Sequence, residues 1–428
     1  MAALARDAVA RVLRLGKANI VLAIFVTLGT LSCALIANAG GLAVPKANVI
    51  PEGTKHIPIM YLRELRKRPF PVSLLDIAPK DEGYAGAKLA IDDNNTTGRF
   101  LKQSFSLKVF ESSDPSEIVA EAKRLADTGK ALFVVDLAAD TLLKVSDALN
   151  DKQVLILNVG APDQRLREED CRANIKHTIP SRDMLTDALS QYLAWKKWRR
   201  VFLVSGPQAA DKLFAQAFRH SAKRFGLKIV GEKVFKYEVG SRRSDGGFEQ
   251  IQKQIPSFTQ SAPEHDVLIV ADEWGQFGDY FPYRTWKARP VAGTHGLFPT
   301  TWHPGVELWG ATQFQNRFKR KWNRVMRPLD YNAWMAVRTI GEAATRAPST
   351  SAKDLIAYIG SPKFSLAAFK GQKLSYREWN GQLRQPIFLT TAKLHVTVSP
   401  QPGFLHQRTV LDTLGIDKPE TKCKGYTP

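Results

Sequence analysis

The feature that most constrains this chain is its alternation of short strand-like runs with longer segments of helical period. The strand-like runs are Phe105–Phe110, Ala131–Leu137, Val154–Val159, Val201–Ser205, Lys228–Val234 and Asp266–Ala271. Asp114, Pro115 and Glu117 form a helix-start signal, and Gly129 ends the helical stripe that follows. Further helices are expected over Ala139–Leu149, Ser181–Trp195, Ala209–Phe225 and Asp330–Arg346. Mostly apolar strands that alternate with helices are typical of parallel sheets covered on both faces.

The strand and helix pattern restarts at Ser181, which predicts a second sheet of the same class. We expect an α/β fold of two doubly wound parallel-sheet lobes joined by a hinge. Lobe one would cover residues 45–180 plus 312–372, and lobe two would cover residues 181–311 plus 373–428. Tyr237–Gly247 is polar and is expected to be a surface loop. Ala292–Gly310, rich in Pro, Gly and Thr, is expected to pass between the lobes.

Residues 1–39 have the pattern of an export signal. Arg11, Arg14 and Lys17 precede an apolar stretch from residue 20 to 36, and Ala37-Asn38-Ala39 supplies a small-residue end. We predict cleavage near Ala39 and a periplasmic location. A retained membrane anchor is the alternative, because the apolar stretch approaches the length of a span. A lipoprotein site at Cys33 is disfavoured by Thr30, which stands where a Leu is wanted.

Two cysteines, Cys171 and Cys423, remain after the expected cleavage. In an exported chain an even pair predicts one disulfide, and two unrelated buried thiols are the alternative. The sequence has no C-x-x-C pair and no Cys/His spacing typical of a metal site. We therefore expect no metal and no bound cofactor.

The formal charge is +20, and the leader carries +3 of it, which leaves about +17 on the rest of the chain. Such a charge suits acidic partners or an anionic membrane face. Basic clusters occur at Arg63–Arg68, Lys196–Arg200 and Lys319–Arg324, and the last two include Trp198 and Trp322. Nucleic acid is not expected as a partner, because exported chains seldom meet it and charge runs are usually solvated helix faces.

Ligand-binding loops are expected where parallel strands end at the carboxyl edge of each sheet. The loops are Lys80–Tyr84, Asp136–Thr141, Asn158–Asp163, Gly206–Asp211 and Ala271–Gly275. The candidate ligand-binding residues on them are Asp81, Glu82, Tyr84, Asp136, Ala138, Ala139, Asp140, Thr141, Gly160, Ala161, Asp163, Gln208, Asp272, Glu273 and Trp274.

Asp81 and Glu82 decide what the first of these loops can hold. They follow an apolar run at Leu74–Ile77, and we expect them in the first turn of a helix that ends near Gly98. Carboxylates there satisfy the helix dipole and repel a phosphate. The spacing G-x-G-x-x-G is also absent, so a nucleotide site at this loop is not expected.

Acidic side chains dominate the candidate residues, although the chain as a whole is basic. By charge complementarity, a cleft lined by them would favour a cation, an amine or a hydroxyl-rich neutral ligand. The alternative is that the acids cap helices or pair with nearby Lys and Arg. A metal site is conceivable, but the compact acid spacing of a cation loop is absent. Tyr84 and Trp274 could stack on a ligand or pack in the core.

Catalysis has little support in the sequence. The motifs G-x-S-x-G, H-E-x-x-H and G-x-x-x-x-G-K-[ST] are absent, and the eight His residues are scattered. We expect a protein that is not an enzyme. A hydrolase or oxidoreductase that uses the cleft acids is the alternative.

Four stretches, in order, resemble the periplasmic substrate-binding proteins of branched-chain amino acid ABC transporters. They are GAKLAIDDNNTTG, DPSEIVAEAKRLADTGKALFVV, VLILNVGAPDQRL and LSQYLAWKKWRRVFLVSG. The resemblance implies the type I periplasmic binding fold, closure of two lobes over a small-molecule ligand, and delivery to an ABC permease in the inner membrane.

A narrower resemblance covers nearly the whole mature chain. PYRTWKARPVAGTHGLFPTTWHP, WGATQFQNRF and SPQPGFLHQRTVLDTLGIDKPETKC are similar to the subfamily found with pyrroloquinoline-quinone-dependent alcohol dehydrogenase systems. This resemblance implies a place in periplasmic alcohol oxidation. It also leaves a second expectation: an accessory protein without transport, docked on a quinoprotein dehydrogenase or its cytochrome.

The family's ligand-binding pattern carries over unevenly. In the amino-acid binders an acid on lobe two holds the ligand ammonium, and Glu273 in ADEWG is its counterpart. The hydroxyls that hold the ligand carboxylate are largely missing, because DLAADT and NVGAPD offer only Thr141. The resemblance therefore implies an amino-acid-binder fold whose carboxylate recognition differs.

Overall fold

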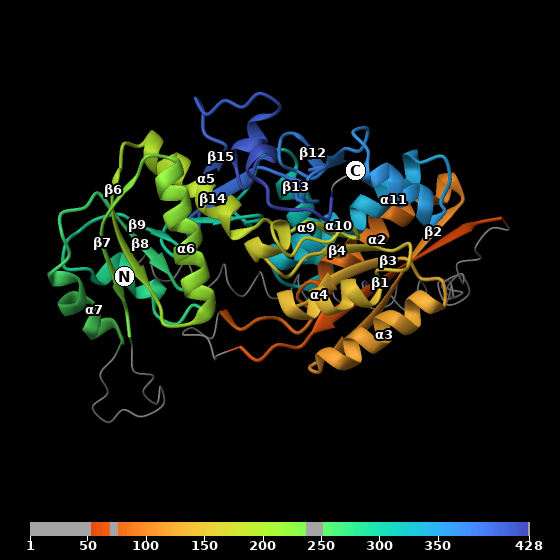
Figure 1. The fold of residues 1–428 in the computed structure, drawn as a ribbon, viewed down its shortest axis with the longest axis horizontal. Helices are drawn as coiled ribbons and strands as arrows, with labels where there is room; N and C mark the ends of the chain where they lie inside the picture. The colour runs from red at the N-terminus through yellow and green to blue at the C-terminus, as the bar shows by residue number, and fades with distance from the viewer. Residues whose placement is uncertain (1–52, 69–75, 237–250, 427–428) are drawn as a thin grey trace, which may run out of the picture. The chain divides into compact units, whose positions relative to one another are not determined.

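The computed structural model describes residues 53–68, 76–236 and 251–426. The expected signal segment, the surface loop Tyr237–Gly247 and the first half of the apolar run at Leu74–Ile77 lie outside the described residues. Residues from Gly53 to Pro428 form one compact unit. Two parallel sheets with helices on both faces make up most of this unit (Figure 1).

The first sheet has the strand order β2-β1-β3-β4-β5, and all its pairs are parallel. Its strands are β1 Lys55–Glu64, β2 Gln103–Ser112, β3 Leu132–Asp136, β4 Leu155–Asn158 and β5 Ile175–His177. The helices around it are α2 Tyr84–Gly98, α3 Pro115–Asp127, α4 Ala139–Ala148, α9 Ala311–Trp322, α10 Pro328–Arg346 and α11 Ala352–Gly360.

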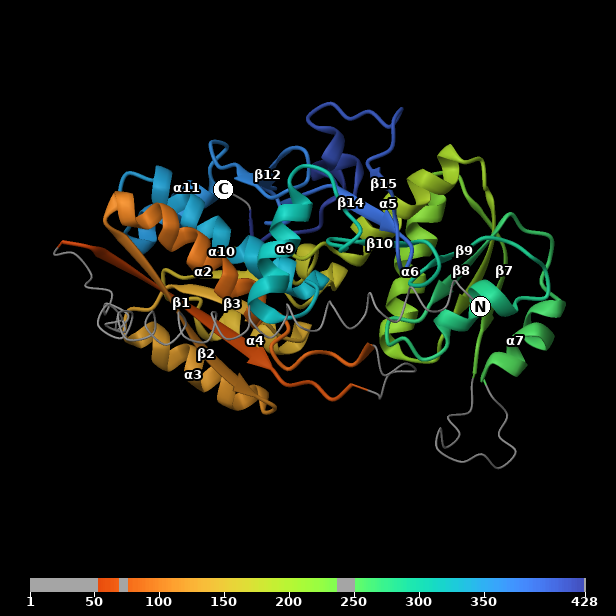
Figure 2. The ribbon, with the colours of Figure 1, turned by 180° about the vertical axis from the view of Figure 1, so that it is seen from behind.

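Alternate residues of the first sheet point to opposite faces and pack in two separate hydrophobic cores. Tyr61, Val134 and their neighbours pack with α2, α9, α10 and α11, and Leu62 and Phe133 pack with α3 and α4. Helices α9, α10 and α11 therefore pack on the first sheet, although they follow the second sheet in the sequence. Helix α10 lies beside α2 (Figures 1 and 2). The approach is close, because a Cβ at Gly86 would stand 1.8 Å from the carbonyl oxygen of Asp330. Only glycine fits there.

The second sheet repeats this arrangement with the strand order β7-β6-β8-β9, again all parallel. Its strands are β6 Arg200–Ser205, β7 Lys228–Val234, β8 Val267–Ala271 and β9 Val291–Gly293. The helices around it are α5 Arg182–Trp195, α6 Ala209–Arg224, α7 Ile251–Gln260 and α8 Phe281–Arg284. One face packs against α5 and α6, and the other packs against α7 and the Phe277 and Phe281 rings.

Two small antiparallel sheets complete the structure. One joins β10 Phe298–Thr300, β14 Ile387–Thr390 and β15 His395–Ser399, and the other joins β11 Leu366–Ala367, β12 Lys373–Tyr376 and β13 Leu383–Arg384. Part of the expected passage Ala292–Gly310 is thus strand.

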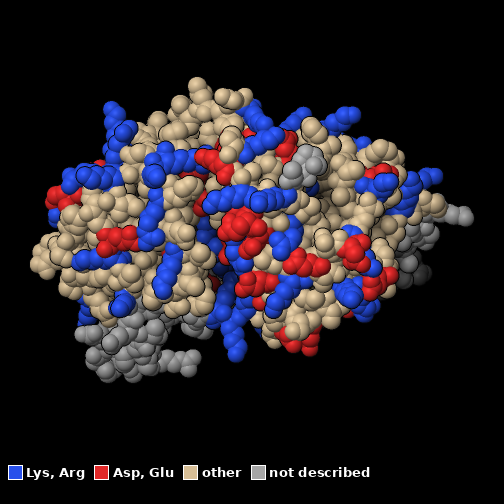
Figure 3. Space-filling view, in the orientation of Figure 1, with Lys and Arg blue, Asp and Glu red and all other residues tan. Residues whose placement is uncertain are grey.

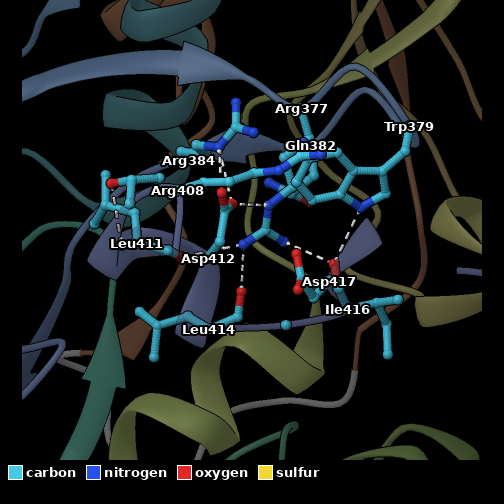
Figure 4. A network of polar contacts seen from close by, with 12 residues as sticks. Arg377, Trp379, Gln382, Arg384, Arg408, Leu411, Asp412, Leu414, Ile416 and Asp417 are labelled. Atoms are coloured by element: carbon cyan, nitrogen blue, oxygen red, sulfur yellow. Dashed lines mark hydrogen bonds and ion pairs between the residues drawn. The ribbon is translucent and has the colours of Figure 1, made fainter. Parts of the chain in front are cut away.

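The C-terminal segment, which consists of the residues after β15, is held against β12 and β13 by a buried ionic network (Figure 4). Nε of Arg377 and Nε of Arg384 both donate to the Asp412 carboxylate, at 2.9 and 2.8 Å. Nη2 of Arg377 also donates to the carbonyls of Leu411 and Leu414. Near the end of the chain, Cys171 and Cys423 form a disulfide that spans 252 positions.

The structure confirms the α/β class with parallel sheets and corrects several details. The central strand β1 was not predicted, nor were β9, α7, α9 or α11. At the start of α3, the Asp114 carboxylate accepts from the Ser116 N–H, as the helix-start signal indicated. The described end of the Leu74–Ile77 run is not strand. Among the described residues, no helix has both the length and the apolarity needed to cross a membrane.

Candidate functional site

Asp81 and Glu82 lie just before α2, not in its first turn. The N–H of Gly83, the residue before α2, donates to Oδ1 of Asp330 at 2.8 Å, so α10 supplies the acid at this helix end. Asp81 pairs with Nε of Arg324 at 3.0 Å. The predicted first-turn position was therefore wrong, because the turn at Gly83 has a positive φ that delays the helix.

Glu82 is buried and stands between two cations. Its carboxylate is 3.0 Å from Nε of Arg327 and 3.9 Å from Nη1 of Arg68. Burial raises the pKa of Glu82, and the two guanidiniums oppose that shift. Both acids of the first loop are thus paired with basic residues of the same chain.

The loops after β3 and β4 hold their acids in the same way. Asp136, at the end of β3, is 2% exposed and forms ion pairs with Arg66 and Arg63. Gly160 lies against it, since a Cβ there would meet Oδ1 of Asp136 at 2.2 Å. Asp140 pairs with Arg165 at the surface.

The small residues on these loops shape the backbone. The Ala138 N–H donates to Oε2 of Glu64 at 2.7 Å, which ties the start of α4 to the end of β1. Ala139 and Thr141 are buried in α4. The Ala161 carbonyl accepts from Nη1 of Arg167 at 2.9 Å. Thr141 therefore presents little hydroxyl surface to a ligand.

Arg182, the first residue of α5, connects the loops of the two sheets. Its Nε and Nη2 donate to the two carboxylate oxygens of Glu273, after β8, at 2.6 and 2.7 Å. Its Nη1 is 3.4 Å from Oδ2 of Asp163, in the loop after β4. The Arg182 side chain is 8% exposed. Of the predicted acids, Asp163 and Glu273 are thus the two that one side chain brings together across the sheets.

Asp272 and Asp211 form the buried part of the site. Oδ2 of Asp272 accepts from the N–H groups of Phe277 and Gly278, both at 2.7 Å. Asp211 accepts from the N–H groups of Glu273 at 2.8 Å and of Gln208 at 3.2 Å, which places Gln208 at the cap of α6. Burial raises the pKa of Asp211 to about 6.

In the described part of the chain, Oδ1 of Asp272 is buried without a hydrogen-bond partner. Nη1 of Arg182 is also buried without a well-formed hydrogen bond, and its contact with an acid is the 3.4 Å ion pair to Asp163. A buried donor or acceptor that lacks a partner is costly, so each such atom calls for an explanation, and a bound ligand is one. This pair therefore marks where polar groups of a ligand could be recognised.

The two aromatic candidates behave differently. Tyr84 packs edge to face on Trp322, with ring centroids 5.9 Å apart. Trp274 is 44% exposed and lies beside Glu273 in sequence. Trp274 therefore remains the candidate for stacking on a ligand.

The candidate acids do not form an uncompensated negative cleft. Most of them pair with nearby basic residues, which was the alternative expectation. Six of the seven acids pair with arginines, and the seventh, Asp272, is held by backbone N–H groups. The arginines are Arg63, Arg66, Arg68, Arg165, Arg182, Arg324 and Arg327. Figure 3 likewise shows Lys and Arg interspersed with Asp and Glu on the face it displays. Within the described ranges, no group of three His, Cys, Asp or Glu side chains could hold a metal ion.

Two hollows in the described structure lie away from these loops. One, of about 120 Å³, lies between α2, β2 and α10 and is lined by polar residues that include Asn94, Gln103 and Arg338. The other, of about 860 Å³, is an open groove in the C-terminal segment beside Leu405, Arg408 and Lys418. Neither is lined by a candidate ligand-binding residue.

Comparison with known proteins assigns the fold. Residues 80–250 match the family described as Periplasmic binding protein. The Leu/Ile/Val/Thr-binding protein of Salmonella typhimurium is 23% identical over 190 residues, 41% of this chain and 52% of that protein. This chain thus matches about half the length of its curated relatives.

Solved structures match over a larger part of the chain. A branched chain amino acid ABC transporter periplasmic ligand-binding protein from Burkholderia xenovorans has a TM-score of 0.66 at 15% identity, covering 87% of this chain and 100% of that one. A solute binding protein from R. palustris, in complex with benzoate, has a TM-score of 0.61 at 12% identity, covering 86% and 100%. The chain has the type I periplasmic binding protein fold.

Proposed function

We propose that this protein is the periplasmic solute-binding component of an ABC importer. The observation that carries the proposal is Arg182, which joins Asp163 after β4 to Glu273 after β8. Loops from the carboxyl ends of two parallel sheets meet at this side chain, where ligands bind in sheets of this kind. The similar proteins are ligand-binding proteins, which supports binding in place of catalysis.

The motion we propose is hinge closure of lobe one, residues 45–180 plus 312–372, against lobe two, residues 181–311 plus 373–428. A ligand that contacts both lobes selects the closed state by its differential affinity for that state. The segment that connects β5 to α5 is one of the crossings between the lobes that would form the proposed hinge. The protein would then deliver its ligand to a permease in the inner membrane.

The ion pairs change the expected ligand class. Because arginines compensate the acids, the site does not call for a cation, and we propose a neutral or anionic small molecule. Nη1 of Arg182, which contacts Oδ2 of Asp163 only at 3.4 Å, suits a carboxylate or hydroxyl oxygen, and the unpartnered Oδ1 of Asp272 suits a hydroxyl. The benzoate complex of a similar protein supports a carboxylate.

The finer part of the proposal is a ligand linked to alcohol oxidation. Its support is the resemblance of the sequence to the subfamily found with quinoprotein alcohol dehydrogenases. Oxidation of alcohols yields aldehydes and then carboxylic acids, which fits the ligand class proposed for Arg182. Export with cleavage near Ala39 remains part of the proposal.

A ligand screen tests this function. Thermal shift and calorimetry would compare alcohols, aldehydes, carboxylic acids, amino acids, amines, metal ions and quinone cofactors. A true ligand at 100 times its Kd stabilises the native state by about 2.7 kcal/mol. The effect should vanish in Arg182→Gln and persist in Asp147→Asn, which removes an exposed partner of Arg172. Failure of every compound class would refute solute binding.

The second candidate is an accessory protein that docks on a periplasmic quinoprotein dehydrogenase or its cytochrome. The observation that favours it is the formal charge of the chain without its leader, about +17, which suits an acidic partner. Pull-down from periplasm at low and then moderate salt should recover such a partner and then release it. A binder that retains its small ligand but captures no protein would exclude this role.

A further inference from the structure

A basic and aromatic surface lies where α5 turns into β6. We call it the Trp195 surface and define it by Trp195, Lys196, Lys197, Trp198, Arg199, Arg200 and Lys228. Lys228 belongs to it because its N–H donates to the Arg199 carbonyl at 2.7 Å. Figure 3 shows Lys and Arg side chains at the upper left, over the α5–β6 turn of Figure 1.

The aromatic side chains of this surface are held in place from below. The Tyr192 ring contacts the rings of Trp195 and Trp198, with centroids 6.0 and 6.4 Å apart. Nζ of Lys196 stands 5.5 Å from the Trp195 ring and 5.8 Å from the Trp198 ring. Trp195 nevertheless remains 52% exposed. A large ordered indole is thus offered to whatever covers the surface.

The cations of the Trp195 surface are not neutralised by the chain itself. All five are exposed, and none forms an ion pair with an acid among the described residues. Asp266 lies at the same end of the sheet, where its Oδ2 accepts from the Arg200 N–H. Glu264 nearby already pairs with Lys287 and Arg289. The surface is therefore positively charged. At the candidate ligand site, by contrast, the arginines are neutralised by acids.

The position of the surface separates it from ligand binding. Arg200 and Lys228 are the first residues of β6 and β7, at the amino ends of the strands. The candidate ligand loops follow Ser205 and Ala271, at the carboxyl ends. A partner on the Trp195 surface would thus leave the ligand loops uncovered.

We propose that the Trp195 surface docks on an anionic phospholipid bilayer. Trp is enriched at the interface between membrane and water, and clustered Lys and Arg are attracted to anionic headgroups. An acidic protein is the competing partner, because Trp and Arg are enriched at protein interfaces, but lysine is depleted there, and three of the five cations here are lysines. The mixture of an exposed indole and several lysines fits the bilayer better.

Vesicle cosedimentation tests the proposal with the full protein in its exported form. The probes are phosphatidylcholine vesicles with and without phosphatidylglycerol, at low and moderate salt. The test variant is Lys196→Gln with Lys197→Gln, and the matched control is Lys319→Gln with Arg320→Gln, two exposed cations of α9 in another Trp-containing basic run. Trp195→Ala is compared with Trp286→Ala, another exposed indole.

The protein should bind the anionic vesicles, bind the neutral ones poorly, and dissociate as salt rises. At about fivefold per cation, the test pair should lower vesicle affinity roughly 25-fold, with little change in the control pair. Trp195→Ala should weaken binding more than Trp286→Ala. Equal losses in both pairs, or no binding to anionic vesicles, would overturn the proposal. Retention on immobilised polyglutamate without vesicle binding would assign the surface to an acidic protein instead.

Discussion

Asp412→Asn tests the ionic network that holds the C-terminal segment. Asp412 is fully buried and accepts from Arg377, 1% exposed, and Arg384, 11% exposed. The asparagine keeps the shape and one acceptor oxygen, but it leaves two buried guanidiniums without their shared anion. Burial already lowers the pKa of Arg377, and Asp412 opposes that shift.

The expected loss follows from the geometry. Removing one partner of a buried ion pair costs about 3–5 kcal/mol, and the retained amide oxygen places the change near the lower end. The compact unit from Gly53 to Pro428 has about 376 residues, so its unfolding entropy is about 0.8 kcal/mol/K. A loss of about 3–4 kcal/mol should therefore lower the Tm by about 4–5 °C.

Urea and thermal unfolding followed by circular dichroism measure this loss. The matched control is Asp140→Asn, whose side chain is 80% exposed and pairs with Arg165. That surface pair should contribute less than about 1 kcal/mol. If Asp412→Asn lowered stability no more than Asp140→Asn, the network would not carry the stability assigned to it.

Three further changes test other parts of the structure. Burial raises the pKa of Asp187 to about 6 from an ordinary 3.8, so the native state holds an extra proton between about pH 4 and 6. Stability from this group is therefore full below about pH 4 and is lost as the pH rises through 6. Asp187→Asn should remove that slope from urea titrations at pH 4.5 and 6.5, and an unchanged slope would contradict the assignment. Cys171→Ser with Cys423→Ser should lower the free energy of unfolding by about 2–5 kcal/mol, and an unchanged urea midpoint would argue against it. Glu273→Gln should cost about 2 kcal/mol because it leaves the buried Arg182 guanidinium without its bidentate partner, whereas Asp163→Asn should cost less.

The sequence pattern predicted the parallel strands that read as apolar runs, and it missed others for physical reasons. The central strand β1 contains Pro58, which lacks a backbone N–H and argues against an interior strand. The apolar run from Ile59 to Leu62, which is buried in the structure, could have identified this strand. The short strands β9 and β10 have three residues each, too few for any period to show.

The candidate site shows a different limit of the sequence. The sequence pattern placed Glu273 and Asp163 on the loops where the structure has them, but it did not identify Arg182, the side chain that connects them. Arg182 is 91 positions from Glu273, and Arg324 is 243 positions from Asp81. Pairings over such separations depend on how the chain returns to each sheet, which a single sequence does not specify. The acids therefore suggested a cation, an amine or a hydroxyl-rich neutral ligand, whereas their arginine partners favour a neutral or anionic one.

Arg182 stands at the centre of the proposed function, so a structure of the protein with its natural ligand tests that function most directly. Protein purified from periplasm without denaturation should retain the ligand, and native mass spectrometry and electron density would identify it. We predict a neutral or anionic small molecule that contacts Arg182 or Asp272 and at least one residue of the loops after β3 and β4. A bound cation, or a ligand outside these loops, would contradict the account.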